Sequence, residues 1–424
     1  MGYHFSPETD FQQLEQSLAK LYSPEQLSAQ SDRYRGVLAG LKDTFGPFAQ
    51  AAVFSAPGRT EIGGNHTDHQ HGLVLTSSVD LDAIAAVAPN GENVIRIQSE
   101  GFPMNTVELD SLDVREEERN TSAALIRGVA AWFRSQGCRL EGFNACVTST
   151  VFKGSGLSSS AAFEVLVGNI FNELFFDGQC SPVRIAQTGQ YAESVYFGKP
   201  SGLQDQMASS VGGMIAIDFQ DNANPVVERL DFDFSAAGHA LCIIDSGADH
   251  ADLTGEYAAV PQELKEVCGY FGKSVLREVP EADFFAALPE LRQKAGDRAV
   301  LRAIHVYEEN QRVLGQAAAL KRGDFESFLQ LVKSSGLSSW RLLQNVVPAG
   351  YTRHQEVALA LALCERLLEG RGACRVHGGG FAGTIQAFVP LDMLERFRTE
   401  MEKVLGAGSC HVLSIRPAGG VRLV

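Results

Sequence analysis

The sequence predicts two α+β domains with largely antiparallel sheets and an active site in the cleft between them. The chain has 424 residues, which exceeds what one core usually supports, so two domains are expected. Short segments with alternating apolar residues indicate strands, and longer segments with helical periodicity lie between them. The polar run 220–225 separates two such series, so we place the domains at residues 1–225 and 226–424.

The first forty residues predict two helices. Ser6-Pro7 precedes one apolar helical run, and Ser23-Pro24 precedes a second run that reaches Leu41. A serine cap followed by proline is a common helix start. We therefore expect each helix to begin directly after its Ser-Pro pair.

The remaining helices and strands are predicted from changes in the spacing of apolar residues along the chain. Segments 84–88 and 94–97 alternate around a turn that contains Asn90-Gly91, which predicts a β-hairpin. A strand at 143–147 leads through a glycine-serine loop into an apolar helix at 161–175. For the second half we expect helices around 255–269, 298–319 and 355–369, and strands around 384–389 and 411–415.

Composition excludes several classes of partner. The chain carries 36 Lys and Arg against 51 Asp and Glu, a net charge of -15, which disfavours nucleic acid and membrane surfaces. Its 8 cysteines form no CxxC pair, and no apolar run is long enough to span a membrane. We expect a cytoplasmic protein with free thiols.

The segment KGSGLSSSAAFEV (153–165) has the pattern of an anion site. Its glycines permit close backbone approach, and the following helix presents unpaired N–H groups to an anion. It is not a P-loop, because no GK[ST] closes it. A glycine-serine turn that merely caps a buried helix is the alternative.

Three further segments concentrate polar residues or glycines. APGRTEIGGNHTDHQHG (56–72) offers carboxylate, amide and imidazole groups for a polyol, and a His-Asp-His metal cluster is its weaker interpretation. AESVYFGKPSGLQDQMASSVGG (192–213) carries Glu193 and Asp205, which could otherwise be solvated surface acids. RVHGGGFAGTIQAFVP (375–390) permits close backbone approach to a ligand.

In this order the motifs resemble the GHMP kinases over residues 51–390, and GGNHTDH, PSGLQDQMAS and Glu256-Tyr257 look most like the galactokinase family. The resemblance implies a two-domain GHMP kinase fold. It also implies phosphorylation of the anomeric hydroxyl of galactose by ATP with Mg²⁺, giving galactose 1-phosphate and ADP.

The resemblance also implies roles for individual residues. Asp205 would be the catalytic base with Arg59 beside it, and Ser160 and Glu193 would hold Mg²⁺. The implied sugar contacts are Asn65, His66, Asp68, Gly202 and Tyr257. The implied ATP contacts are Gly154, Ser155, Gly156, Leu157, Ser158, Ser159, Ser160, Gly379 and Gly380.

The chain departs from the family pattern at Asn65, where galactokinases usually carry Glu. Because an amide does not repel a carboxylate, a C6-acid sugar such as galacturonate would be less strongly excluded. The segment 122–128 also lacks the family's usual aromatic pair, which leaves the nucleotide base preference open.

Several alternatives follow from these departures. A related sugar 1-kinase could act on galacturonate, an amino sugar or arabinose. A silent sugar and ATP sensor is less favoured, because Asp205, Arg59, Ser160 and Glu193 are all present. The expected partners are a small sugar and ATP, and the oligomeric state, monomer or dimer, stays open.

Overall fold

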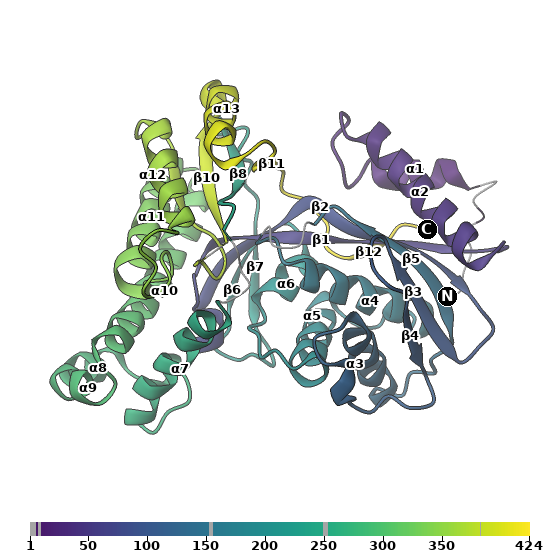
Figure 1. Cartoon of the computed structure of the whole chain (residues 1–424), viewed down its shortest axis with the longest axis horizontal. Coiled ribbons are helices and arrows are strands. Elements are labelled where there is room, and N and C mark those ends of the chain that lie inside the picture. Colours follow the sequence, from purple (N-terminus) through teal and green to yellow (C-terminus); the bar gives the residue numbers. More distant parts are fainter. Residues whose placement is uncertain (1–5, 7–9, 152–155, 249–252, 382) are drawn as a thin grey trace.

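The computed structural model describes residues 6, 10–151, 156–248, 253–381 and 383–424. Within them the chain forms an eight-stranded sheet and a four-stranded sheet, joined by helices (Figure 1). All strand pairs are antiparallel except β3 with β5. The predicted α+β class with largely antiparallel sheets is therefore confirmed.

The first sheet has the order β12-β1-β2-β5-β3-β4, and β6 and β7 extend it from the other end of β2. Its strands are β1 (Ala52–Gly63), β2 (Leu73–Pro89), β3 (Val94–Ser99), β4 (Asn105–Glu108), β5 (Phe143–Ser149), β6 (Met214–Asp218), β7 (Val226–Leu230) and β12 (Val421–Arg422). The change of sheet thus falls after β7, slightly later than the boundary placed at residue 225, and β12 returns to the first sheet.

The predicted hairpin between 84–88 and 94–97 is wrong. Both strands exist, but β5 lies between them, antiparallel to β2 and parallel to β3. The connection after Pro89 is wide enough to admit this strand: Gly142 donates its N–H to the Glu92 carbonyl, and Asn90 bonds Asn144. Long-range pairing therefore overrides the local turn signal.

Helices cover both faces of the first sheet. One face carries α3 (Ser122–Ser135), α4 (Ser159–Phe175), α5 (Pro182–Tyr191) and α6 (Gln204–Val211), and the other carries α1 (Phe11–Leu18) and α2 (Leu27–Phe45) (Figure 1). Every residue of β1 is buried, because α4 and α6 pack on it from one side and α10 (Asp297–Lys321) and α11 (Phe325–Ser338) of the second half cover its end. The π-helical turn η3 (Ala192–Phe197) and the short 3-10 turns η1 (Asp68–Gln70) and η2 (Glu116–Glu118) complete this half.

The two N-terminal helices are confirmed, but their predicted caps are wrong. The N-cap residues are Asp10 and Gln26, so each helix begins three or more residues after its Ser-Pro pair. The Ser6 N–H instead bonds the Asp10 carboxylate at 2.8 Å. The apolar periodicity located these helices correctly, whereas the cap signal did not.

The second sheet has the order β11-β8-β10-β9, formed by β8 (His239–Asp245), β9 (Ala373–Val376), β10 (Thr384–Pro390) and β11 (Cys410–Leu413). Its helices are α7 (Thr254–Tyr270), α8 (Glu281–Ala286), α9 (Leu288–Lys294), α10 (Asp297–Lys321), α11 (Phe325–Ser338), α12 (Glu356–Leu368) and α13 (Leu394–Leu405). The turns are η4 (Leu276–Glu278), η5 (Ser339–Leu343) and η6 (Leu391–Met393). The elements expected in this half are confirmed.

The two halves meet where α10 contacts β1 and β2. This contact brings the second half against the polar residues at the end of β1.

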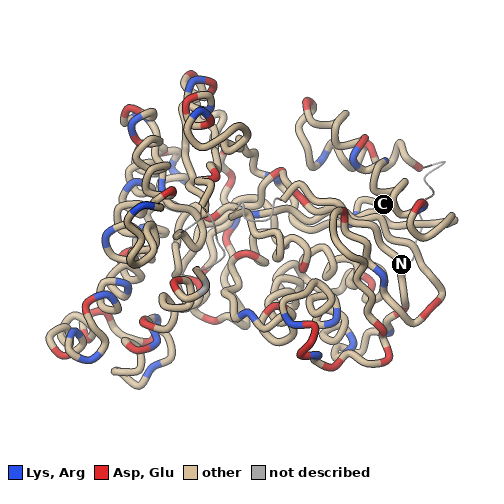
Figure 2. Tube along the Cα trace, viewed as in Figure 1, with Lys and Arg blue, Asp and Glu red and all other residues tan. Residues whose placement is uncertain are grey.

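Figure 2 shows acidic and basic positions interspersed along the outer helices. Among the described residues, no helix combines the length and apolarity that crossing a bilayer requires.

Candidate active site

The centre of the site is an ion pair between Arg59 on β1 and Asp205 in the first turn of α6. Arg59 Nε and Nη2 each lie 2.7 Å from one carboxylate oxygen of Asp205, a bidentate arrangement. The Arg59 side chain is 8% exposed and that of Asp205 is 34% exposed, so the carboxylate opens to solvent while the arginine stays enclosed.

Arg59 also determines the charge of this carboxylate. Burial alone would raise the pKa of Asp205, but the Arg59 guanidinium and the Ser158 hydroxyl hold it below its usual range. Asp205 is therefore ionised at neutral pH.

The glycine-serine segment lies beside this pair. Arg59 Nη1 donates to the Gly156 carbonyl, and the Arg59 N–H donates to the Leu157 carbonyl at 3.0 Å. Ser158 has the left-handed φ of 58°, and α4 begins at the next residue. The positive end of α4 thus lies next to Asp205, where it could hold an anion.

The other predicted ATP contacts differ in their exposure and in their position relative to the cavity lining. Gly154 and Ser155 lie outside the described residues. Leu157 is buried, whereas Gly156, Ser158, Ser159 and Ser160 are partly exposed. Gly379 lines the cavity described below, and Gly380 accepts a hydrogen bond from Tyr257.

Asp68 and Gly202 lie in direct contact on the opposite side of Asp205. A Cβ atom on Gly202 would lie 1.6 Å from Asp68 Oδ2, so any larger residue there would displace the Asp68 carboxylate. Burial and the neighbouring Asp205 raise the pKa of Asp68 to about 6. Two carboxylates in one site therefore have opposite pKa shifts.

Two histidines complete this wall. His66 Nδ1 lies 3.2 Å from His69 Nε2, and His66 Nε2 lies 3.3 Å from the Gly379 carbonyl. Burial and His69 lower the pKa of His66 to about 3, and burial lowers the pKa of His69 to about 4. Both rings are neutral at pH 7, so they serve as hydrogen-bonding groups.

These residues surround a cavity of ≈180 Å³. This volume is below the roughly 300–1,000 Å³ typical of drug-sized ligands, so it suits one small polar ring. Larger cavities of ≈650 Å³ and ≈520 Å³ lie elsewhere and expose mainly apolar surface. The cavity is lined by Arg59, Glu61, His66, Asp68, His69, Glu193, Lys199, Ser201, Gly202, Gln204, Asp205, Gln206, Gly378 and Gly379.

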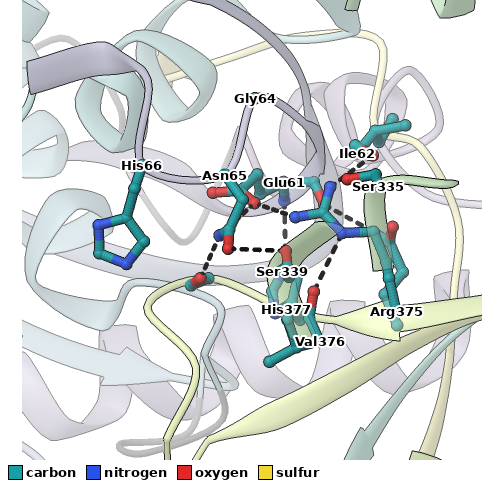
Figure 3. Close-up of polar contacts among 12 residues, drawn as sticks. Glu61, Ile62, Gly64, Asn65, His66, Ser335, Ser339, Arg375, Val376 and His377 are labelled. Atoms are coloured by element: carbon teal, nitrogen blue, oxygen red, sulfur yellow. Dashed lines mark hydrogen bonds and ion pairs between the residues drawn. The ribbon is translucent and has the colours of Figure 1, made fainter. Parts of the chain in front are cut away.

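Asn65 differs from its expected position. It is fully buried, and its amide bonds Glu61, the Gly378 carbonyl and Asn345 at 2.9, 2.5 and 2.8 Å. Figure 3 shows the Asn65 side chain directed toward Glu61, while His66 points the other way. Asn65 therefore lies behind the cavity wall, and the wall itself carries the carboxylate of Glu61.

Tyr257 also lies outside the cavity lining. Its hydroxyl donates to the Gly380 carbonyl at 2.8 Å, and its ring meets Phe381 edge-on at 5.2 Å. A Cβ atom on Gly379 would lie 2.6 Å from this ring. In this structure Tyr257 supports the glycine loop from behind.

Glu193 is the buried carboxylate of η3. Its oxygens accept hydrogen bonds from Lys199 Nζ at 3.2 Å and Gln206 Nε2 at 3.0 Å. Gln206 Nε2 also bonds the fully buried Glu164 at 2.9 Å. No cluster of three or more metal-ligating side chains occurs in the described part of the chain.

A second polar network holds segment 58–72, here called the polar loop, from behind. The first part of this segment, which the sequence predicted as loop, is the end of strand β1, and the rest contains the turn η1. Glu309 on α10 accepts from the Gly64 N–H at 3.1 Å, Ser335 Oγ at 2.6 Å and Arg312 Nε at 2.6 Å. His305 on the same helix contacts the Asn65 carbonyl at 3.0 Å. The serine-rich segment 334–340 has its role here, since Ser339 also bonds Asn65.

Three residues of this arrangement were not predicted from the sequence: Gln204, Lys199 and Arg375. Glu61 was predicted only as one of the polyol-binding groups of segment 56–72, without a contact of its own. Gln204 beside Asp205 was the available signal. Arg375 gave none, because a lone arginine in a strand is not recognisable as the partner of a residue more than 300 positions away.

Comparisons with known proteins place this geometry in context. The model of the GHMP kinases N terminal domain matches residues 124–213, and the galactokinase galactose-binding signature matches residues 41–89. A galactokinase of Streptomyces coelicolor is 30% identical over 376 residues, 87% of this chain and 93% of the relative. A galactokinase of Glaesserella parasuis is also 30% identical, with 84% and 89% covered.

Solved structures agree on the fold. The structure of Lactococcus lactis galactokinase complexed with galactose superposes with a TM-score of 0.77 at 24% identity, covering 90% of this chain and 98% of that one. A D-glycero-D-manno-heptose 1-phosphate kinase structure has a TM-score of 0.59 at 16% identity, with 88% and 98% covered. The fold is therefore shared with kinases that act on different substrates.

Proposed function

The chain belongs to the galactokinase family of GHMP kinases, and on that premise we propose that it transfers the γ-phosphoryl group of ATP to the anomeric hydroxyl of galactose. The products are galactose 1-phosphate and ADP. The observation that carries the proposal is the bidentate Arg59–Asp205 pair at the edge of a small polar cavity, adjacent to the N-terminus of α4.

Asp205 is the proposed catalytic base. As the anomeric oxygen forms its bond to phosphorus and the bond from phosphorus to the bridging oxygen of ADP breaks, the hydroxyl proton passes to an Asp205 oxygen. A carboxylate with a low pKa is a weak base toward a ground-state hydroxyl. Asp205 therefore orients the hydroxyl first and takes the proton late, when the forming bond has made it acidic.

Arg59 is the proposed catalytic cation. Its Nε and Nη2 fix Asp205, and its Nη1 reaches the Gly156 carbonyl of the phosphate segment. Because one guanidinium contacts both parts, it sets their spacing and offsets charge that develops between them. Phosphoryl transfer depends mainly on such positioning and charge neutralisation.

The ATP phosphates are proposed to lie on the segment 154–160 and the loop containing Gly379 and Gly380. The N-terminus of α4 supplies backbone N–H groups and a positive dipole end. Segment 122–128 lies at the start of α3, and its lack of an aromatic pair keeps a preference among nucleotide bases an open part of the proposal.

Ser160 and Glu193 are the proposed Mg²⁺ ligands, and their chemistry fits. Mg²⁺ is usually held in kinases by one or two carboxylates together with water and substrate phosphates. Glu193 provides one carboxylate at the cavity wall, and Ser160 provides a partly exposed hydroxyl in the first turn of α4. When bound, the ion would neutralise phosphate charge.

For the sugar, Asp68, His66 and the backbone of Gly202 are proposed as direct contacts, because all three line the cavity. Asn65 and Tyr257 are proposed to act on the sugar through the wall residues that they position.

The described cysteines are free, which supports a proposed location in the reducing cytoplasm.

The test is ADP release from purified protein with ATP, Mg²⁺ and a panel of galactose, galacturonate, arabinose and N-acetylgalactosamine. We expect turnover with galactose, and a fall of about 10²- to 10⁴-fold in kcat for Asp205→Asn, with sugar binding retained. Turnover with another sugar would change the substrate and keep the mechanism. ATP and sugar binding without any turnover would support a sensor instead.

A further inference from the structure

We propose that Glu61, rather than Asn65, is the residue with which this chain selects a neutral sugar. In this proposal, which rests on the proposed function, the Glu61 carboxylate accepts a hydrogen bond from a ring hydroxyl other than the anomeric one. The same carboxylate excludes sugars that carry an acid group.

The two oxygens of Glu61 have different environments. Oε1 accepts hydrogen bonds from Arg375 Nη2 at 2.5 Å and Asn65 Nδ2 at 2.9 Å. Oε2 is approached by Gln204 Nε2 at 3.4 Å, a long contact, and both Glu61 and Gln204 line the cavity. One oxygen is therefore anchored in the protein, while the other retains lone pairs for a ligand O–H.

Arg375 fixes the orientation of this carboxylate. Its side chain is completely buried, and it also donates to the carbonyls of Ile62 at 2.9 Å and Val376 at 3.0 Å (Figure 3). With three acceptors bound, the guanidinium has a single position available. Glu61 is consequently preorganised, which lowers the entropy lost when a ligand binds.

From Asn65 alone we expect weak exclusion of acid sugars such as galacturonate. The position of Glu61 predicts the opposite, strong exclusion. Asn65 uses its amide to hold Glu61, so the amide does not face the ligand. The wall contains four carboxylates, from Glu61, Asp68, Glu193 and Asp205, against the cations Arg59 and Lys199. A C6-acid sugar would bring another negative charge into this enclosed space, which disfavours its binding.

A purely structural role for Glu61 is the competing explanation, since a buried ion pair with Arg375 could exist for folding alone. The two roles differ in what Glu61→Gln changes. The structural role predicts lower stability and equal effects on all sugars. The selective role predicts a change in the ratio of affinities for galactose and galacturonate.

The experiment is isothermal titration calorimetry of galactose and galacturonate without ATP, on the full chain, with melting temperatures measured in parallel. For Glu61→Gln we expect the Kd of galactose to rise roughly tenfold, because a charge-assisted hydrogen bond becomes a neutral one. We expect discrimination against galacturonate to fall by at least about tenfold. Glu266→Gln, an exposed acid on α7, should change neither value.

Glu61→Asp provides a variant that keeps the negative charge opposite Arg375 if Glu61→Gln does not fold. It shortens the side chain by one methylene, so galactose should bind at least about fivefold more weakly while galacturonate stays excluded. The proposal is overturned if Glu61→Asp binds galactose as the wild type does. It is equally overturned if a folded Glu61→Gln keeps both the galactose Kd within twofold and the original discrimination.

The proposed function fails separately from this inference. If the wild type binds another neutral sugar in place of galactose, galactose is the wrong substrate, and the same variants are then measured with that sugar. If the wild type prefers galacturonate, the exclusion by Glu61 is wrong whatever the reaction. If the wild type binds no sugar, both proposals fall.

Discussion

The two sides of the polar loop use the same residue types for different purposes. On the cavity side, Asp205 is ionised and its side chain is 34% exposed. Asp68 is enclosed, and its pKa is raised. On the far side, Glu309 is fully buried and bonded by Arg312, Ser335 and the Gly64 N–H. Carboxylates with unused lone pairs face the cavity, whereas saturated carboxylates hold the fold.

This difference separates residues for chemistry from residues for stability on the two sides of one segment. A saturated buried carboxylate offers nothing to a ligand, and its removal leaves a buried charge without its partner. A carboxylate at the cavity wall can bind a ligand, and its replacement affects binding or catalysis more than folding. Substitutions on the two sides should therefore be distinguishable by what they change.

The largest effect on stability is expected at the far side. Glu309→Gln removes a charge that contacts Arg312 at 2.6 Å in a fully buried position, which should lower the free energy of unfolding by about 3–5 kcal/mol. Glu308→Gln is the matched control, because Glu308 contacts the same arginine at 3.1 Å but is 49% exposed. It should cost about 0–1 kcal/mol, as measured by urea unfolding.

The pH dependence of stability tests the same residue independently. Although burial alone would raise it, His305, Arg312 and Arg375 lower the pKa of Glu309 to about 2, below its unfolded value of about 4.3. Its contribution is present above the unfolded pKa and is lost as pH falls toward 2. Glu309→Gln should therefore lose less stability than the wild type between about pH 4.5 and 2. Parallel curves would contradict the far-side assignment.

The next largest effect is a pH dependence of galactose binding that comes from Asp68 on the cavity side. With a pKa raised to about 6, Asp68 is ionised at pH 7.5 and about nine-tenths protonated at pH 5. If its carboxylate accepts sugar hydroxyls, the Kd of galactose should rise about tenfold over that range. Calorimetry at pH 5, 6 and 7.5 measures this change.

Asp68→Asn supplies the comparison, because an amide does not titrate. Its Kd should be weaker and should lack the part of the pH dependence that Asp68 contributes, whereas the part from Glu61, whose pKa burial raises, is common to both proteins. His66 and His69, with pKa values of about 3 and 4, stay neutral from pH 5 to 7.5 and do not contribute. A flat wild-type profile would mean that the ionised form of Asp68 is not the binding form.

Much of the arrangement could be predicted from local sequence signals. Apolar periodicity located α1, α2, α4 and α10, and the glycine-rich motifs located the residues that surround the cavity. Apart from the two N-terminal helix caps, where the local Ser-Pro signal was wrong, the failures are contacts over long sequence separations. The strand order at β5 depends on a partner more than forty residues away, and the orientation of Asn65 depends on Gly378 and Asn345 in the other half.

The position of Glu61 shows the same limit. Its sequence neighbours mark a polar loop, but whether its carboxylate faces the cavity depends on Arg375 on β9. A motif therefore predicts which segment forms a site more reliably than which side chain of that segment meets the ligand.

The smallest effect, a modest fall in kcat, is expected for substitution of Lys199, a second cation of the cavity wall. Its Nζ lies 3.2 Å from Glu193, and its side chain is 63% exposed, so it can reorient at little energetic cost toward a phosphoryl group near Asp205. At this exposure one charge contributes roughly 1 kcal/mol, so Lys199→Met should lower kcat about fivefold while the KM for galactose stays constant. Lys199→Arg should restore most of kcat, and Lys273→Met, an exposed lysine beyond α7, is the control. A change in KM alone would instead assign Lys199 to the sugar side of the cavity.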